Sequence, residues 1–421
     1  MRVLVISNLF PPGFVGGYEL GALDVTEGLH RAGHEIHVLT SDYFSDDGAS
    51  FAGFPVIRTL ESFKPSRRHV SVADEIRHGD LLSPANLRRL GSELIAFRPD
   101  SILMFNCDGI GVLGFLQHLV ALGARPVLFL MDNVFYGLMP PAEHYETAKR
   151  IFGAPGFLDH VSFITVSQRL WAEVKSTLRQ ELPDPLLVPG WHDPRVDYAA
   201  IALPSVNGDA PVRFVFASRV TGTKGIDIVV GAARQLKATG TTNFIIDVYG
   251  AGDTAPLQQI VVAFGLSDHI HYRGVLPKTE MTRRLADYDA LLLPTWEREP
   301  LPFVVPEAAA AGCIPVMTAG IGAAEWFSDG IDCFMIRRDI PGLAEAMTRL
   351  MRMPPGEREA MRQRCRETGL SSFNFDDALR AVEAELHRVA ADTIKLTPAA
   401  IRGVEAALVL LDGMLTLTEV T

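Results

Sequence analysis

The stretch Arg213-Phe-Val-Phe-Ala-Ser-Arg219-Val-Thr-Gly-Thr-Lys224-Gly-Ile-Asp227 predicts a strand, a glycine turn and the start of a helix. Its first residues are β-branched or aromatic, which favours a strand, and Gly222 and Gly225 mark the turn that follows. Arg219 and Lys224 are therefore expected at the carboxyl end of the strand. Ligands bind at that edge of open α/β sheets, and a guanidinium with an ammonium suits a diphosphate. A basic pair in this position is also typical of a solvated loop.

A second stretch, Glu299-Pro-Leu-Pro-Phe-Val-Val-Pro-Glu307, sets two carboxylates across the entry to a helix. Pro302 and Pro306 would each cost about 3 kcal/mol inside a helix, so we expect a loop first and a helix starting near Pro306. Carboxylates only accept hydrogen bonds, which suits polyhydroxylated ligands such as sugars and ribose. The alternative is that Glu307 complements the helix dipole and that Glu299 is solvated.

Strand-like segments alternate with helix-length segments along the chain, which predicts an α/β protein with parallel sheets and helices on both faces. Turn residues gather in Ala202–Pro211, so we place a linker between two domains there. Residues 45–90 are expected to form a loop-rich or helical insertion. The expected strands are 2–7, 35–40, 101–105, 126–130, 161–166, 213–217, 244–249 and 289–293.

Several motifs occur in the order seen in retaining glycosyltransferases with two Rossmann-like domains. They are Lys224-Gly225, Tyr249-Gly-Ala-Gly-Asp253, Tyr272-Arg-Gly274, Asp289-Ala-Leu-Leu-Leu-Pro-Thr295 and the Glu299/Glu307 pair. The chain resembles glycosyltransferase family four over residues 1–45 and 160–390. In the N-terminal half, 1–7 resembles the first strand, 11–17 the glycine loop and 33–40 the second strand.

The resemblance implies the GT-B fold, in which two Rossmann-like domains face each other across a cleft and a C-terminal helix crosses back to the first domain. Residues 1–203 would form the acceptor-side domain, with the tail from about 390 to 421 packing back onto it. Residues 204–389 would form the domain that binds the nucleotide sugar.

The resemblance also implies roles for the charged residues. Arg219 and Lys224 would hold the diphosphate and stabilise it as a leaving group. Glu307 would accept hydrogen bonds from the ribose hydroxyls, and Glu299 would contact the transferred sugar.

Further residues complete the expected binding set. Leu301 and Phe303, between the two glutamates, are expected beside the nucleotide. Gly16 and Gly17 precede a helix, so their backbone N–H groups and the helix dipole would face the phosphates of the donor. A tight turn without a ligand is the alternative at these glycines.

The chain departs from the family pattern at several positions. Met131 stands where the family has a catalytic histidine, so either Asp132 or Asn133 takes over part of its orienting role or activity is lost. Pro302 replaces a glycine and removes one backbone N–H from the sugar-binding loop. His192 would supply the missing imidazole only if the domains fold it into the cleft, and an ordinary interdomain residue is the alternative.

The function implied is transfer of a glycosyl unit, of the hexosyl type, from a UDP- or GDP-sugar to a hydroxyl of a glycan, a lipid-linked acceptor or a small molecule. We expect no cofactor and no metal, because two cations already face the phosphates and no ligand cluster is evident. One alternative is a catalytically impaired protein that binds sugar nucleotides, motivated by Met131 and Pro302. Another is a sugar-nucleotide epimerase, which the spacing of Glu299 and Glu307 argues against.

Composition restricts the partners and the compartment. A net charge of −11 argues against nucleic-acid binding, and the four cysteines, at 107, 313, 333 and 365, lack metal-type spacing, which favours a reducing compartment. The chain opens on a strand-like segment and shows neither a signal peptide nor a long apolar span, so we expect a cytoplasmic location. The basic run Lys64–His69 is expected to be solvated, with peripheral contact to an anionic membrane face or acceptor as the alternative.

Three other patterns suggest weaker hypotheses. Asp287-Tyr-Asp289 imitates a metal-binding carboxylate motif but falls between a helix and a buried strand, so we discount it. His34 and His37 alternate with apolar residues at a strand start and are expected to be structural. The segment Gly320–Glu325 is a candidate glycine turn facing the phosphates.

Overall fold

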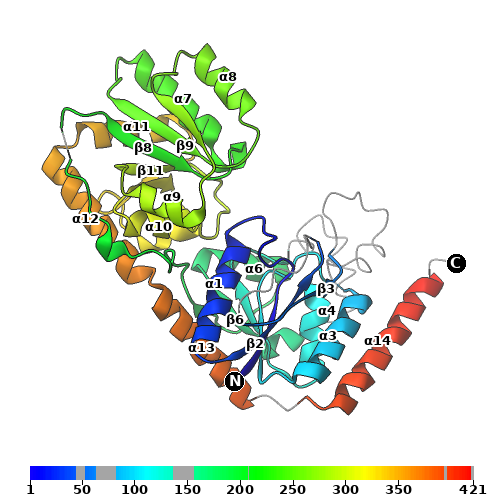
Figure 1. Cartoon of the computed structure of the whole chain (residues 1–421). Helices are drawn as coiled ribbons and strands as arrows, with labels where there is room; N and C mark the ends of the chain where they lie inside the picture. The colour runs from blue at the N-terminus through cyan, green and yellow to red at the C-terminus, as the bar shows by residue number, and fades with distance from the viewer. Residues whose placement is uncertain (44–52, 63–81, 136–155, 207, 393–395, 419–421) are drawn as a thin grey trace. The chain divides into compact units, whose positions relative to one another are not determined.

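The computed structural model describes residues 1–43, 53–62, 82–135, 156–206, 208–392 and 396–418 of the chain. The chain divides into two compact α/β units, which we call the first and second domains (Figure 1). The first domain comprises Met1–Val188 and Leu379–Thr421, and the second comprises Pro189–Ala378. The C-terminal tail therefore returns to the first domain, as expected.

The domain boundaries lie earlier than the predicted positions after residues 203 and 389. The reason is that the segment following Val188 packs on the second domain before the turn-rich linker is reached. Arg366 donates hydrogen bonds to the backbone carbonyls of Tyr198 and Ile201. These bonds fix residues that the sequence assigned to the first domain.

The first domain is built on one parallel sheet, which has seven strands within the described residues. Their spatial order is β3-β2-β1-β4-β5-β6-β7, and Val5 on β1 is paired with Val38 on one side and Leu103 on the other. The strands are β1 (Arg2–Ile6), β2 (Glu35–Ser41), β3 (Val56–Leu60), β4 (Ser101–Met104), β5 (Val127–Leu130), β6 (Ser162–Thr165) and β7 (Leu186–Leu187).

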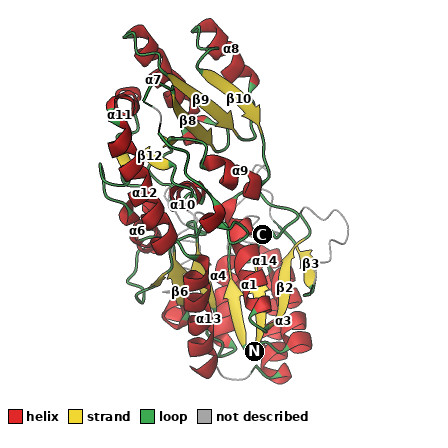
Figure 2. Ribbon diagram, turned by 60° about the vertical axis from the view of Figure 1, so that its left-hand side comes forward, coloured by secondary structure: helices red, strands yellow, loops and turns green. Residues whose placement is uncertain are grey.

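The second domain repeats this plan with six described strands in the order β10-β9-β8-β11-β12-β13, all parallel. Figure 2 shows its sheet in yellow with helices packed around it. The strands are β8 (Val212–Ala217), β9 (Phe244–Tyr249), β10 (Ile270–Gly274), β11 (Ala290–Leu293), β12 (Ile314–Thr318) and β13 (Phe334–Ile336).

Both sheets follow the Rossmann strand order, in which the chain reverses direction across the sheet between the first and fourth strands. In the first domain this switch point lies between β1 and β4, and in the second between β8 and β11. The predicted fold of two Rossmann-like domains is therefore confirmed. All predicted strands occur within one residue of their expected ends.

The α-helices connect the strands and cover the sheets. Helix α14 packs on α3 in the first domain, and α11 packs on α7 in the second (Figure 1). The helices are α1 (Gly17–Arg31), α3 (Pro84–Phe97), α4 (Val112–Ala121), α6 (Gln168–Leu178), α7 (Ile226–Ala238), α8 (Ala255–Ala263), α9 (Lys278–Leu285), α10 (Val304–Ala310), α11 (Ile340–Arg352), α12 (Pro355–Ser372), α13 (Phe375–Asp392) and α14 (Pro398–Thr418). Among the helices in the described residues, none has the length and apolar character needed to cross a bilayer.

The central strands form the core because they are apolar on both faces. Residues 3–6 of β1 and 290–292 of β11 are fully buried, which is typical of parallel strands covered by helices on both sides. Helix α12 is tied to this core by Arg362, whose buried guanidinium donates to the carbonyls of Ala286 and Gly312 at 2.9 Å each. The four cysteines are buried free thiols.

Some strands escaped the sequence analysis. Strand β3 lies inside the segment expected to be loop or helix, while the basic run Lys64–His69 in that segment falls outside the described residues. Strand β12 carries Pro315, which argues against a central strand. The proline is tolerated because pairing with β13 begins only at Val316, so no ladder bond on that side is lost.

We predict a pH-dependent loss of stability from His118 on α4. Its imidazole is 3% exposed and has no hydrogen-bond partner among the described residues. Burial lowers its pKa from the ordinary 6.5 to about 4. The unfolded chain therefore takes up a proton as the pH falls below 6.5 while the folded chain does not, and stability is lost across the window from 6.5 to 4.

The measurement is urea unfolding of the wild type and His118→Leu at pH 7 and pH 5. Between these values the wild type should lose about 2 kcal/mol more unfolding free energy than the variant. An equal loss in both proteins would contradict a buried neutral histidine.

Candidate functional site

The candidate site lies at the switch point of the second domain, where the loops after β8 and β11 meet. The β8 loop carries Arg219 and a 3₁₀ turn, Gly222–Lys224, before α7 begins. The β11 loop carries Glu299. The two loops are joined by their backbones, because the N–H of Trp296 donates to the carbonyl of Thr223 at 2.9 Å.

Glycine is required where these loops touch. Gly225 has φ +81°, and a Cβ atom there would lie 2.1 Å from the carbonyl oxygen of Pro294. Both the positive φ and this contact exclude a side chain. Gly225 thus allows the end of β11 to approach the start of α7, which brings Lys224 and Glu299 together.

Lys224 and Glu299 form an ion pair, as the Nζ atom donates to Oε2. The same oxygen accepts hydrogen bonds from the Thr295 hydroxyl at 3.2 Å and from the indole N–H of Trp296 at 3.1 Å. The Lys224 and Glu299 side chains are only 13% and 12% exposed, so Glu299 is a fixed carboxylate and not a solvated one. Within the described residues all three side-chain contacts fall on Oε2, which leaves Oε1 to accept from a ligand hydroxyl.

Arg219 lies two residues beyond β8, as predicted, and its side chain is exposed. The part of the chain that the structure describes contains no ion pair to it. The loop backbone is nevertheless fixed, because the N–H of Val220 donates to the carbonyl of Ala251 at 2.8 Å. Arg219 is therefore an exposed cation on the same loop as Lys224, and the backbone of that loop is held in place.

Glu307 lies in the first turn of α10 and is 5% exposed. The helix begins at Val304, two residues before the predicted start. The first turn can include Pro306 because the N–H groups of a first turn have no partner within the helix, so the missing N–H of a proline costs nothing there. The Nζ atom of Lys278, at the start of α9, lies 3.4 Å from Glu307 Oε1 and 5.3 Å from the ring centre of Phe303.

Lys278 was missed by the sequence analysis. It follows the Tyr272–Gly274 motif by four residues and stands at the amino end of a helix, so a signal was present. A lone lysine there is usually solvated, and only the fold shows that it faces a buried carboxylate.

Leu301 and Phe303 pack against protein side chains and backbone in this structure. Leu301 is buried, with its Cδ2 atom 2.5 Å from where a Cβ of Gly190 would lie. Phe303 meets the ring of Trp191 edge to face at 5.3 Å. Both residues thus hold the segment after Val188 on the second domain. Their expected contact with a nucleotide stays a prediction.

The glycine turn Gly320–Glu325 adjoins the same loops. The N–H of Gly322 donates to the backbone carbonyl of Glu299 at 3.0 Å, and Gly320 has φ +83°. Strand β11 lies between β8 and β12 in the sheet, so the Glu299 loop is contacted by the β8 loop on one side and by the turn after β12 on the other.

In the first domain, the predicted phosphate-binding loop is hydrogen-bonded to the side chain of Glu19. Glu19, which is 3% exposed, accepts hydrogen bonds from the backbone N–H groups of Val15 and Gly16 at 3.2 and 2.9 Å. The N–H of Gly16 is thereby used, so an anion at this helix start would have to bind the N–H groups of Gly17 and Tyr18.

The segment after β5 contains the residues considered as replacements for the family histidine. Met131 is buried, and Asp132 is half-buried and accepts from the N–H of Asn133 at 2.7 Å. The Asn133 side chain is fully buried and donates to Thr177 at 2.9 Å and to Glu173 at 3.2 Å. Asn133 therefore has a structural role, and Asp132 is the better candidate of the two.

His192 is buried in the second domain, where its ring lies 4.6 Å from that of Tyr198. Burial lowers the pKa of its imidazole. In the discounted Asp287–Asp289 motif, Asp289 accepts from the backbone N–H of Arg213 at 2.9 Å and pairs with Arg358 at 3.5 Å. The Asp289 carboxylate thus helps to hold the sheet and α12.

The fold and the arrangement of the site define an α/β protein of the GT-B type. Sucrose-phosphate synthase from Thermosynechococcus elongatus superposes with a TM-score of 0.71 at 16% identity, covering 93% of this chain and all of that one. Anabaena HepE in complex with UDP-glucose gives a TM-score of 0.64 at 16% identity, covering 92% of this chain and all of that one. At these identities the similarity establishes the fold alone.

The sequence of the second domain is similar to known glycosyltransferases. Residues 211–353 match the family model described as Glycosyl transferases group 1. WcaL of Salmonella typhimurium, named as a colanic acid biosynthesis glycosyltransferase, is 29% identical over 171 residues. That match covers 39% of this chain and 42% of WcaL, less than half of either protein.

We predict that Gly225→Ala destabilises the protein more than Gly240→Ala. Both glycines have positive φ, +81° and +77°, but a Cβ at Gly240 would meet nothing within 4 Å. Gly240→Ala should cost about 1 kcal/mol of unfolding free energy for the left-handed backbone alone. Gly225→Ala should cost a further 1–3 kcal/mol, roughly, because the β8 and β11 loops must separate. Urea unfolding measures both, and equal losses would show that the two loops do not touch at Gly225.

Proposed function

We propose that the protein is a retaining glycosyltransferase that moves a sugar from a nucleotide-diphosphate sugar to a hydroxyl group. The observation that carries the proposal is the Lys224–Glu299 ion pair at the switch point of the second domain, with Arg219 on the same loop as Lys224. The match of residues 211–353 to the glycosyltransferase group 1 model supports the same conclusion.

The chemistry asks for two kinds of stabilisation. Negative charge grows on the diphosphate as the glycosidic bond breaks, and Arg219 and Lys224 can stabilise that charge. The sugar develops oxocarbenium character, and a carboxylate that binds its hydroxyls helps to fix its position. Glu299 is suited to this, since Oε2 is fixed by Lys224 while Oε1 is open to a hydroxyl. Glu307 would accept from the ribose.

Retention of configuration needs either a carboxylate nucleophile or attack from the face that the leaving group occupies. We propose same-face attack, in which an oxygen of the departing phosphate takes the proton of the acceptor hydroxyl. Asp132, half-buried after β5, would take over part of the orienting role of the histidine that the family has at Met131.

The donor and acceptor classes follow from chemistry and from the related proteins. HepE, of the same fold, was solved with UDP-glucose, which supports a UDP-sugar here, with a GDP-sugar as the alternative. WcaL is named for colanic acid biosynthesis, which favours a glycan or lipid-linked acceptor in polysaccharide, glycolipid or glycoside synthesis. We further propose that donor binding needs no divalent metal, because Arg219 and Lys224 supply positive charge.

A second candidate is a protein that binds the same sugar nucleotides without transferring the sugar. Met131 at the position of the family histidine favours it, because a buried thioether cannot orient a hydroxyl as an imidazole does.

The deciding experiment incubates the full chain with UDP- and GDP-sugars, with and without hydroxyl acceptors, in the presence of chelator. A transferase releases nucleoside diphosphate faster when acceptor is present. Saturable donor binding without any release would favour the binding protein, whereas formation of an isomeric sugar nucleotide would show an epimerase. Release that requires added magnesium or manganese would contradict metal independence.

We predict that Arg219→Ala lowers kcat by on the order of a hundredfold, because a cation at the leaving group stabilises the transition state more than the ground state. Arg219→Lys should recover part of the loss, since an ammonium lacks the planar fork of a guanidinium. Arg352→Ala, which removes an exposed arginine from the last turn of α11, is the control and should leave kcat unchanged. If Arg219→Ala raised only KM, Arg219 would bind the ground state and the transition state equally and would not stabilise the leaving group.

A further inference from the structure

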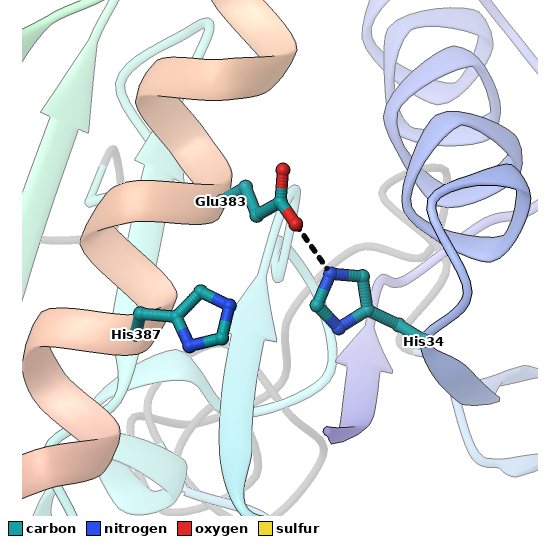
Figure 3. A group of neighbouring side chains, drawn as sticks. All are labelled: His34, Glu383 and His387. Atoms are coloured by element: carbon teal, nitrogen blue, oxygen red, sulfur yellow. Dashed lines mark hydrogen bonds and ion pairs between the residues drawn. The ribbon is translucent and has the colours of Figure 1, made fainter.

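Three side chains with metal-binding atoms lie together in the first domain, and none of them belongs to the candidate functional site. They are His34, Glu383 and His387, and one ligand atom from each lies within 4.8 Å of the other two (Figure 3). The Nε2 atom of His34 is 2.9 Å from Glu383 Oε1. Within the described residues, this is the one group of three or more histidine, cysteine or acidic side chains with such spacing.

His34 is held in place by the end of helix α1. Gly33 has φ +92°, and its N–H donates to the carbonyl of His30 while that of His34 donates to the carbonyl of Leu29. This is the Schellman ending of a helix, which fixes the residue that follows the glycine. The His34 side chain is 5% exposed. Its Nδ1 atom lies 3.5 Å from the backbone nitrogen of Met1, so Nε2 is the atom that faces the group.

Glu383 and His387 stand four residues apart on α13, which places them on one face of the helix. Figure 3 shows both side chains extending from this helix toward His34. The neighbouring face is buried by Val382, Leu386 and Val389, so the helix cannot rotate freely. His387 itself is exposed and can change rotamer without disturbing the core.

We propose that His34, Glu383 and His387 bind a zinc-class transition-metal ion. Two imidazoles and one carboxylate form a ligand set that suits Zn²⁺, with water in the fourth position. Magnesium and calcium prefer sites made of oxygen atoms alone, so they are poor occupants. Tetrahedral ligands at zinc distances lie about 3.3 Å apart. His34 and Glu383 are already near that separation, and His387 closes the site by a small movement.

The bound ion would fasten α13 to the turn between α1 and β2. Residues from Leu379 onward belong to the first domain, so the ion would hold the returning tail to the domain on which it packs. The sequence pattern around His34 predicts a structural role, and a bound ion would be the ligand through which His34 fulfils it. It is independent of the proposed glycosyl transfer, whose residues lie elsewhere.

The experiment uses the untagged full chain, stripped of metal by chelator and dialysed. Zn²⁺ is titrated by calorimetry, and Tm is measured with and without Zn²⁺, with Mg²⁺ as the ion control. The wild type should bind one Zn²⁺ and gain Tm, since an ion that binds only the folded state stabilises it. Co²⁺ should give the intense visible absorption of a four-coordinate site.

The decisive variant is His387→Ala, because it removes an exposed ligand and leaves the His34–Glu383 bond intact. In chelator, the variant and the wild type should have the same Tm. The variant should nevertheless bind Zn²⁺ more than about a hundredfold more weakly, which is a larger loss than mutation of a residue that only supports a metal ligand causes. Glu383→Gln should lose Zn²⁺ binding as well. His160→Ala, which removes another exposed histidine of the first domain, should bind Zn²⁺ like the wild type.

The proposal is overturned if the wild type binds no stoichiometric Zn²⁺, which would reduce the group to the His34–Glu383 hydrogen bond. It is overturned equally if His387→Ala binds Zn²⁺ as tightly as the wild type, because the ion would then lie elsewhere.

Discussion

The close contact between the loops after β8 and β11 is the constraint on which the candidate site depends. These strands are neighbours only because the chain reverses direction across the sheet between them, and their carboxyl ends therefore lie side by side. Because Gly225 has no side chain, the backbone carbonyl of Pro294 can occupy the space that a Cβ atom would take. Once the backbones are joined, Lys224 and Glu299, which lie 75 residues apart in sequence, form a shielded ion pair.

Much of the fold could be predicted because its signals are local. Short apolar runs marked the strands on either side of both switch points. The misses have local causes too. Strand β12 was not predicted because it contains Pro315, and the sequence does not show that pairing with β13 begins one residue later, at Val316. The domain boundary at Val188 could not be predicted because it depends on hydrogen bonds from Arg366 to the carbonyls of Tyr198 and Ile201, which lie more than 160 residues earlier in the chain.

The site was predicted less completely, since its side chains are paired by the fold. Charge type and position identified Arg219, Lys224, Glu299 and Glu307, because each follows a strand or begins a helix at the ligand-binding edge. No local pattern shows that Glu307 faces Lys278, or that Glu19 accepts hydrogen bonds from the glycine loop. Such pairings arise when elements distant in sequence are packed together, and they decide which groups remain open to a ligand.

The pairings suggest how a chain with a net charge of −11 could bind the anionic donor that we propose. Each buried glutamate of the site has its own lysine, Lys224 for Glu299 and Lys278 for Glu307. Each pair is close to neutral, so the carboxylates can accept hydroxyl hydrogen bonds without repelling a diphosphate from the same edge of the sheet. Arg219 has no carboxylate partner among the described residues, so its charge is the one left uncompensated. These three cations and two carboxylates thus sum to one positive charge even though the protein as a whole is acidic, and the proposed diphosphate would experience this local charge.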